Sequence, residues 1–219
     1  MNLTSLPLFQ GLTAPTLTAM REHGALHQRT FEKGAVIFHT GDVVHELGIV
    51  LFGRVQIETI DLWGSRGILS SIGPGETFAE TYAFCRVPLM VDAVSAQESE
   101  VLFLDLDVVQ DCPICSVQWA GTIQSNLLKV FARKNLTLSQ RIFCTSAKTI
   151  RGRLLTYLSA QAVQHGSSSF EIPFNRQQLA DYLNLDRSAL SKELGRMRQE
   201  GLLEFQKNRF TLYADPLEF

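Results

Sequence analysis

The sequence predicts an α+β protein: an N-terminal antiparallel β-roll of the jelly-roll type, one long helix, and a C-terminal winged helix-turn-helix. Three observations support this class. Short apolar runs punctuated by glycine fill residues 34–104, an apolar repeat at steps of three and four runs through residues 118–143, and two short helical patterns with a tight connection follow near the C-terminus. With 219 residues, 45% of them hydrophobic, the chain has enough apolar material for two small domains or one large one.

The roll is predicted from strand-like runs at residues 35–38, 47–51, 55–57 and 101–104, which are rich in Val, Ile, Leu and Phe. Glycine-containing turns separate them. Short strands at this spacing favour an antiparallel roll or barrel. Ahead of the roll, residues 13–25 predict a helix with Leu17 and Met20 on its apolar side.

The long helix is predicted from residues 118–143, which contain no proline and no glycine after position 121. A helix of about 26 residues is about 39 Å long, more than a small domain needs to cover its own core. We therefore expect part of its apolar stripe to contact a second copy of the chain. Asn135 interrupts the stripe, where it either fixes the register of a coiled coil or turns to solvent. The predicted dimerisation residues are Ile123, Leu127, Val130, Phe131, Leu138 and Ile142.

A further helix is expected from residue 146 to the His165-Gly166 stop signal, and Pro173 limits the run 170–173 to an edge strand. Asn175 and Gln178 then form a capping box for a short helix. After a turn, Asp186 caps a second helix that runs to about residue 199. Two helices with so short a connection make a helix-turn-helix.

The second helix of this motif has two distinct faces. At 100° per residue, Leu190, Leu194 and Met197 lie within about 60° of one another. Small polar side chains and a cation occupy the other side, which is what close approach to base edges in a major groove requires. The predicted base-reading residues are Arg187, Ser188, Ser191 and Lys192.

A basic hairpin is predicted after Gly201, with its tip at residues 206–209. Cations and amides at such a tip suit phosphate contacts. The distribution of charge also favours the C-terminal part as the DNA-binding region. Residues 147–219 carry ten basic and eight acidic side chains, whereas residues 1–146 carry ten basic and fourteen acidic ones. We predict supporting DNA contacts from Arg176, Gln177, Lys207 and Asn208.

This order of parts resembles the CRP/FNR family of bacterial transcription regulators, the group of the cyclic-AMP receptor protein and the fumarate-nitrate regulator. The segments 175–183 and 186–194 carry the resemblance, which extends over nearly the whole chain. It implies a sensor domain at residues 1–113, a dimerisation helix at 114–145 and a DNA-binding domain at 146–219. It also implies a homodimer on a pseudo-palindromic operator in double-stranded DNA, RNA polymerase as a further partner, and no catalytic activity.

The resemblance also defines where an effector is expected. Glu80 corresponds to the family's ribose-binding glutamate, while its phosphate-binding Arg-Ser pair falls on Met90 and Val91. A thioether and an alkyl group cannot neutralise a buried phosphate. The sequence therefore predicts an unidentified small-molecule effector other than cyclic AMP. The expected pocket residues are Glu80, Phe84, Arg86, Met90 and Val91.

Cysteine and histidine spacing does not predict a metal, haem or iron-sulfur site. Cys112 and Cys115 form a single C-x-x-C pair, and the histidines lack a ligand-pair spacing. A thiol switch or cluster using these residues with Cys85 and Cys144 stays an alternative, as does a ligand-binding or protein-interaction module without DNA binding. No apolar run approaches the roughly 20 residues that span a bilayer, and the N-terminus has no targeting signal, so a cytoplasmic protein is expected.

Overall fold

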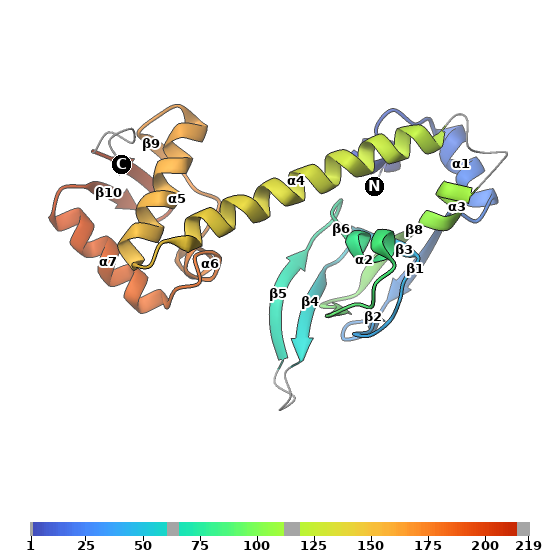
Figure 1. Ribbon diagram of the computed structural model, residues 1–219, viewed down its shortest axis with the longest axis horizontal. Coiled ribbons are helices and arrows are strands. Elements are labelled where there is room, and N and C mark those ends of the chain that lie inside the picture. Colours follow the sequence, from blue (N-terminus) through green and yellow to red (C-terminus); the bar gives the residue numbers. More distant parts are fainter. Residues whose placement is uncertain (1, 61–65, 112–118, 214–219) are drawn as a thin grey trace. The chain divides into compact units, whose positions relative to one another are not determined.

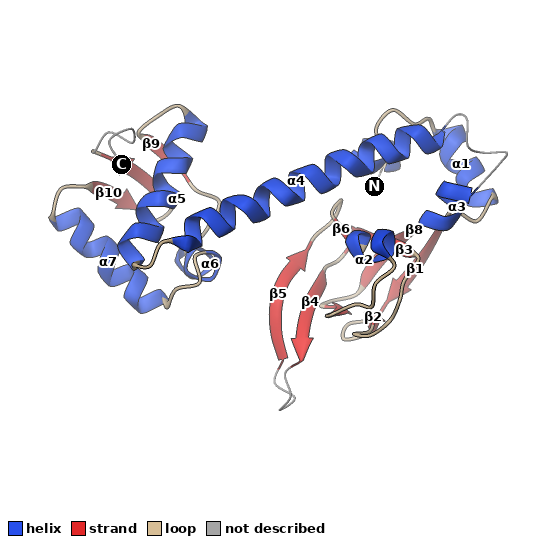
Figure 2. Cartoon of the chain, viewed as in Figure 1, coloured by secondary structure: helices blue, strands red, loops and turns tan. Residues whose placement is uncertain are grey.

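The computed structural model describes residues 2–60, 66–111 and 119–213 and contains two compact units, residues 1–132 and 133–219 (Figure 1). Each unit has its own apolar core. The α+β class, with a β-roll, a long helix and a winged helix-turn-helix, is confirmed (Figure 2).

The first unit contains two four-stranded antiparallel sheets whose apolar faces share one core. Leu47 and Phe103 of one sheet and Phe38 and Val55 of the other belong to the same buried cluster. One sheet has the order β1 (Leu26–Phe31), β8 (Ser99–Asp105), β3 (Glu46–Phe52), β6 (Thr77–Phe78), and the other has the order β2 (Val36–Phe38), β7 (Asp92–Ser95), β4 (Val55–Ile60), β5 (Arg66–Ile72).

Gly48 shows how closely the sheet residues pack. It pairs with Phe78 across β3 and β6, and a Cβ atom at position 48 would overlap the Phe78 ring. The glycine is therefore required by packing against an aromatic ring rather than by a turn.

Short helices accompany the roll: η1 (Leu3–Ser5), η2 (Pro7–Phe9), α1 (Ala14–Glu22), α2 (Glu80–Cys85) and α3 (Leu106–Asp111). Thr13 caps α1, and Leu17 and Met20 are buried as predicted. The sequence reasoning did not predict α2 or α3, whose six residues are too few for a periodic pattern.

The helix α4 (Gly121–Ser146) has the 26 residues expected of the long helix. Its first turns belong to the core of the first unit, where Ile123 and Leu127 are buried. Asn126 is also buried and donates hydrogen bonds from Nδ2 to the carbonyl oxygens of Leu8 (3.0 Å) and Gln10 (2.8 Å). The N-terminal segment is thus attached to α4 by polar as well as apolar contacts.

The second unit packs three helices against a small antiparallel sheet of the order β10-β11-β9. The strand β9 lies at the edge, as Pro173 predicted. Buried residues of all three helices and the sheet, among them Leu154, Leu179, Leu194 and Phe210, form one core. Its elements are α5 (Ile150–His165), β9 (Ser169–Glu171), α6 (Arg176–Tyr182), α7 (Arg187–Gln199), β10 (Leu203–Gln206) and β11 (Arg209–Leu212).

Candidate nucleic-acid interface

The helix α7 is fixed in place by a cap at its start and by a fully buried apolar side. Asp186 Oδ1 accepts a hydrogen bond from the backbone N–H of Ala189 (2.9 Å) and another from the Ser188 hydroxyl. These bonds, the one from Ser188 first, hold the pKa of the Asp186 carboxyl below its usual range. Leu190, Leu194 and Met197 are 0% exposed. The helix can therefore present only its opposite side to a ligand.

That opposite side carries the predicted base-reading residues. Arg187, Ser188, Ser191 and Lys192 are all exposed. Ser188 donates its hydroxyl proton to the capping carboxylate of Asp186, so it offers an oxygen acceptor outward. The side chains of Arg187, Ser191 and Lys192 have no hydrogen bond or ion pair to another described residue, which leaves them available to an external partner.

Gly195 lies on the same side and was not singled out from the sequence. At 100° per residue it falls between Ser191 and Lys192 around the helix. A Cβ at this position would meet nothing within 4 Å in the protein, so the glycine is not explained by packing inside the chain. A gap in the side-chain layer here would let the helix backbone approach a groove closely.

Two arginines hold the turn between α6 and α7. Arg153 donates from Nη1 to the carbonyl oxygens of Leu183 and Asn184 (both 3.0 Å) and from Nε to that of Ala147 (2.9 Å). Arg141, on α4, donates from Nε to the backbone carbonyl oxygen of Tyr182 (3.1 Å). These donors satisfy carbonyls that the end of α6 leaves unpaired, and cations suit a helix C-terminus. The pair therefore positions the turn from which α7 starts.

A second arginine on α5 connects that helix directly to α7. Arg151 donates to Glu193 from Nε (2.6 Å) and to both carboxylate oxygens of Glu200 (2.8 Å each). Its hydrogen bonds keep the pKa of Glu200 below the usual range. The orientation of α7 is thus set by side chains of its neighbours at both ends.

The wing hairpin of β10 and β11 is attached to the start of α6 through Arg176. The guanidinium lies over the rings of Phe205 (4.9 Å to the centroid) and Phe210 (5.7 Å), and Nη2 donates to the Lys207 carbonyl (3.4 Å). Partial burial lowers the pKa of Arg176. Asn208 Nδ2 likewise donates inward, to Glu171 Oε1 (2.7 Å) and the Ile172 carbonyl (3.2 Å).

The four residues predicted to make supporting DNA contacts therefore differ in how far their side chains are already engaged within the protein. Arg176, Lys207 and Asn208 line one cleft of about 510 Å³ between the wing and α6, whereas Gln177 lies outside it and donates to Asp181 Oδ1 (2.8 Å). Arg176 and Asn208 already hold the wing in place. Lys207, exposed at the hairpin tip with φ +55°, is the freest of the four.

The exposed apolar residues of α4 correct the predicted dimerisation stripe. Ile123 and Leu127 are 0% and 4% exposed because they pack in the core of their own unit, so assigning them to a partner-facing surface was wrong. Leu128, 69% exposed, was missed. A stripe at alternating steps of three and four, the spacing of a coiled-coil seam and called the pairing seam below, runs through Leu128, Phe131, Asn135, Leu138 and Ile142. Val130 lies about 120° from the centre of this stripe around the helix.

The five residues expected to line an effector pocket are not gathered around the apolar cavity of the first unit. Glu80 is buried, whereas Met90 is 76% exposed and Val91 is half-buried. Arg86 ends α2 and pairs with Asp107 of α3, alongside His45, whose Nδ1 lies 2.8 Å from the same carboxylate. Of the five, Phe84 lines the cavity of about 720 Å³ in the first unit. Spacing along the chain does not determine where the side chains of a loop point.

The cysteines and histidines supply no metal site in the part of the chain that the structure describes, where no three His, Cys, Asp or Glu side chains gather. Cys85 is exposed and Cys144 is buried. Cys112 and Cys115 lie outside the described residues. Within the described residues, no helix is both long and apolar enough to cross a bilayer.

Comparison with known proteins relates both units to the same group. The cyclic nucleotide-binding domain model matches residues 28–112, and the Crp-like helix-turn-helix domain model matches residues 152–214. A CRP-like cAMP-activated global transcriptional regulator of Mycobacterium tuberculosis is 22% identical over 91% of this chain and 88% of its own. The transcriptional activator protein FnrA of Stutzerimonas stutzeri is 22% identical over 89% of this chain and 82% of its own.

Among solved structures, a CooA variant from Carboxydothermus hydrogenoformans has a TM-score of 0.57 and 17% identity, over 91% of both chains. This similarity concerns the fold. The sensor and helix-turn-helix matches together, in this order on one chain, show that the protein belongs to the CRP/FNR family of DNA-binding transcription regulators.

Proposed function

We propose that the protein acts as a homodimer that binds a pseudo-palindromic operator, with α7 of each protomer in one of two successive major grooves. The observation that carries this proposal is the free, exposed set Arg187, Ser191 and Lys192 on the side of α7 opposite its buried residues. Arginine and lysine donate to guanine or phosphate, and serine pairs with several base edges. Half-sites one DNA turn apart, about 34 Å, fit the two-fold symmetry of such a dimer.

The pairing seam of α4 supports the homodimer. Leu128, Leu138 and Ile142 are each more than half exposed, although they follow the repeat of a coiled coil. Large apolar side chains gathered along one helix side are typical of a contact surface. Asn135 within the seam would then fix the register of the two helices.

We further propose that the effector is not cyclic AMP. Met90 and Val91, which the resemblance aligns with the family's phosphate-binding pair, carry no charge, and the charge of Arg86 is already compensated by Asp107. An unpaired phosphate would cost several kcal/mol to bury. Regulation of transcription would then proceed through RNA polymerase in the cytoplasm in response to another small molecule.

The proposed DNA contacts are tested by selecting an operator from random duplexes and measuring affinity for it against unrelated DNA. The double variant Arg187→Ala, Ser191→Ala should lose at least about tenfold in this ratio, since one good base contact contributes about 1–3 kcal/mol. Arg21→Ala, an exposed arginine on α1, is the matched control and should keep the ratio. An unchanged ratio in the double variant, with folding intact, would rule out α7 as the reading element.

A further inference from the structure

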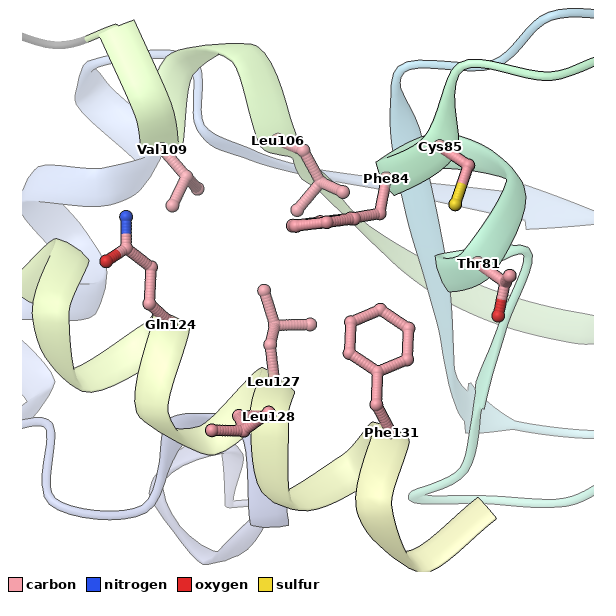
Figure 3. A pocket seen from close by; sticks show the side chains of 9 residues that line it. All are labelled: Thr81, Phe84, Cys85, Leu106, Val109, Gln124, Leu127, Leu128 and Phe131. Carbon is pink, nitrogen blue, oxygen red and sulfur yellow. The ribbon is translucent and has the colours of Figure 1, made fainter. Parts of the chain in front are cut away.

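A cavity of about 720 Å³ lies in the first unit where α2, α3 and the start of α4 meet (Figure 3). Helix α2 contributes Phe84 and α4 contributes Phe131. Their rings pack edge to face, with 5.7 Å between the ring centroids. Figure 3 shows Val109, Leu127 and the two rings directed into the space. The full lining is Thr81, Phe84, Cys85, Leu106, Val109, Gln124, Leu127, Leu128 and Phe131.

The chemistry of this lining is apolar and uncharged. None of the nine residues carries a formal charge. The Thr81 hydroxyl and the Gln124 amide are on different walls, and neither side chain hydrogen-bonds to another described residue. A few polar groups at the margin of an apolar cavity orient a ligand without requiring it to be charged.

The volume of this cavity is much larger than that of an ordinary packing defect in a protein core. Ligand cavities are typically about 300–1,000 Å³, whereas gaps in a core rarely exceed one water molecule. Phe84, which is outside the pairing seam, is 53% exposed at this cavity, so an occupant would remove a large apolar side chain from water.

We propose that this cavity binds one small, uncharged, predominantly apolar molecule, aromatic or branched aliphatic, through Phe84, Leu127 and Phe131. A charged ligand would find no counter-ion among the lining residues. Only the role of this molecule as the effector rests on the proposed function; the binding itself does not. A second copy of the chain is the competing occupant, because Leu128 and Phe131 belong to the pairing seam, whereas Phe84 of α2 and the buried Val109 of α3 lie outside that seam.

Binding can be measured on the full chain with N-phenyl-1-naphthylamine, an uncharged fluorescent probe of suitable polarity. The probe should saturate at one molecule per protomer, with an affinity independent of protein concentration. Saturating probe should also slow alkylation of Cys85 by N-ethylmaleimide at least about fivefold, followed on the peptide containing residue 85 by mass spectrometry.

Two variants locate the probe. Thr81→Trp fills the cavity from the exposed side of α2 and should weaken probe binding at least about tenfold. Thr18→Trp, at an exposed position of α1, is the control and should bind like the parent chain.

The cavity proposal fails if the probe does not saturate, if Cys85 is alkylated at an unchanged rate, or if Thr81→Trp binds normally. It also fails if affinity falls as protein concentration rises, since a second copy would then be the occupant. Loss of operator selectivity in the experiment on α7 leaves these outcomes untouched, so the two proposals can fail separately.

Discussion

At the scale of single residues, Gly195 combines a cost to folding with an advantage in binding. Its backbone is helical and its surroundings are open, so Gly195→Ala should stabilise α7 by about 0.5–1 kcal/mol through the higher helix propensity of alanine. If α7 approaches a groove on this side, the added methyl group should weaken operator binding.

Urea unfolding and fluorescence anisotropy with operator DNA measure the two effects. Gly121→Ala is the control, because position 121 is also helical and open but lies on α4. Tighter DNA binding by Gly195→Ala would show that this side of α7 does not face the duplex.

The ion pair of Glu200 with Arg151 predicts a specific dependence of stability on pH. Because the folded pKa of Glu200 is lowered, its contribution is fully present above the usual glutamate pKa and is lost as pH falls through the folded value. Glu200→Gln should therefore lower Tm near neutral pH and leave it nearly unchanged at strongly acidic pH. A Tm difference between the two proteins that grows on acidification would contradict this assignment.

At the scale of elements, the turn before α7 depends on Arg153. Arg153→Ala removes three hydrogen bonds to backbone carbonyls and should destabilise the second unit by about 2 kcal/mol. Arg153→Lys should recover only part of this, since a lysine lacks the planar guanidinium whose Nε bonds Ala147 while its Nη1 bonds Leu183 and Asn184. Chemical unfolding measures the loss, with Lys148→Ala, an exposed neighbour, as the control.

Elements with short-range signals could be predicted from the sequence. The capping box of Asn175 with Gln178, the Asp186 cap and the Gly166 stop each involve residues within four positions, and all are present in the structure. Polar strands such as β1 carry no apolar alternation and were missed.

The orientation of α4 could not be predicted in the same way. An apolar stripe with steps of three and four can pass through Leu127 or through Leu128 equally well. Which of the two is buried depends on contacts between distant parts of the chain, such as that of Asn126 with Leu8, 118 positions apart. Nor does the sequence report where Met90 points, because no local rule fixes a loop side chain.

At the scale of the whole molecule, the pairing of two chains should depend on one side of α4. Leu138 lies in the seam, and Leu136, equally exposed at 59%, lies about 160° away around the helix. Leu138→Lys should weaken dimerisation at least about tenfold, whereas Leu136→Lys should not, because only the first buries a charge in an apolar contact. Sedimentation over a range of protein concentrations distinguishes them, and equal effects of the two substitutions would remove the seam from the dimer.

The first turns of α4 and the two residues before it complete the core of the first unit, where Trp119, Ala120, Ile123 and Leu127 are 0–5% exposed. A sensor fragment that stops at residue 111 would lack these side chains. The core residues that they cover would form an exposed hydrophobic patch, which favours aggregation during expression. The shortest soluble fragment should therefore extend through Phe131, so this half of the protein cannot be obtained by cutting the chain where its sheets end.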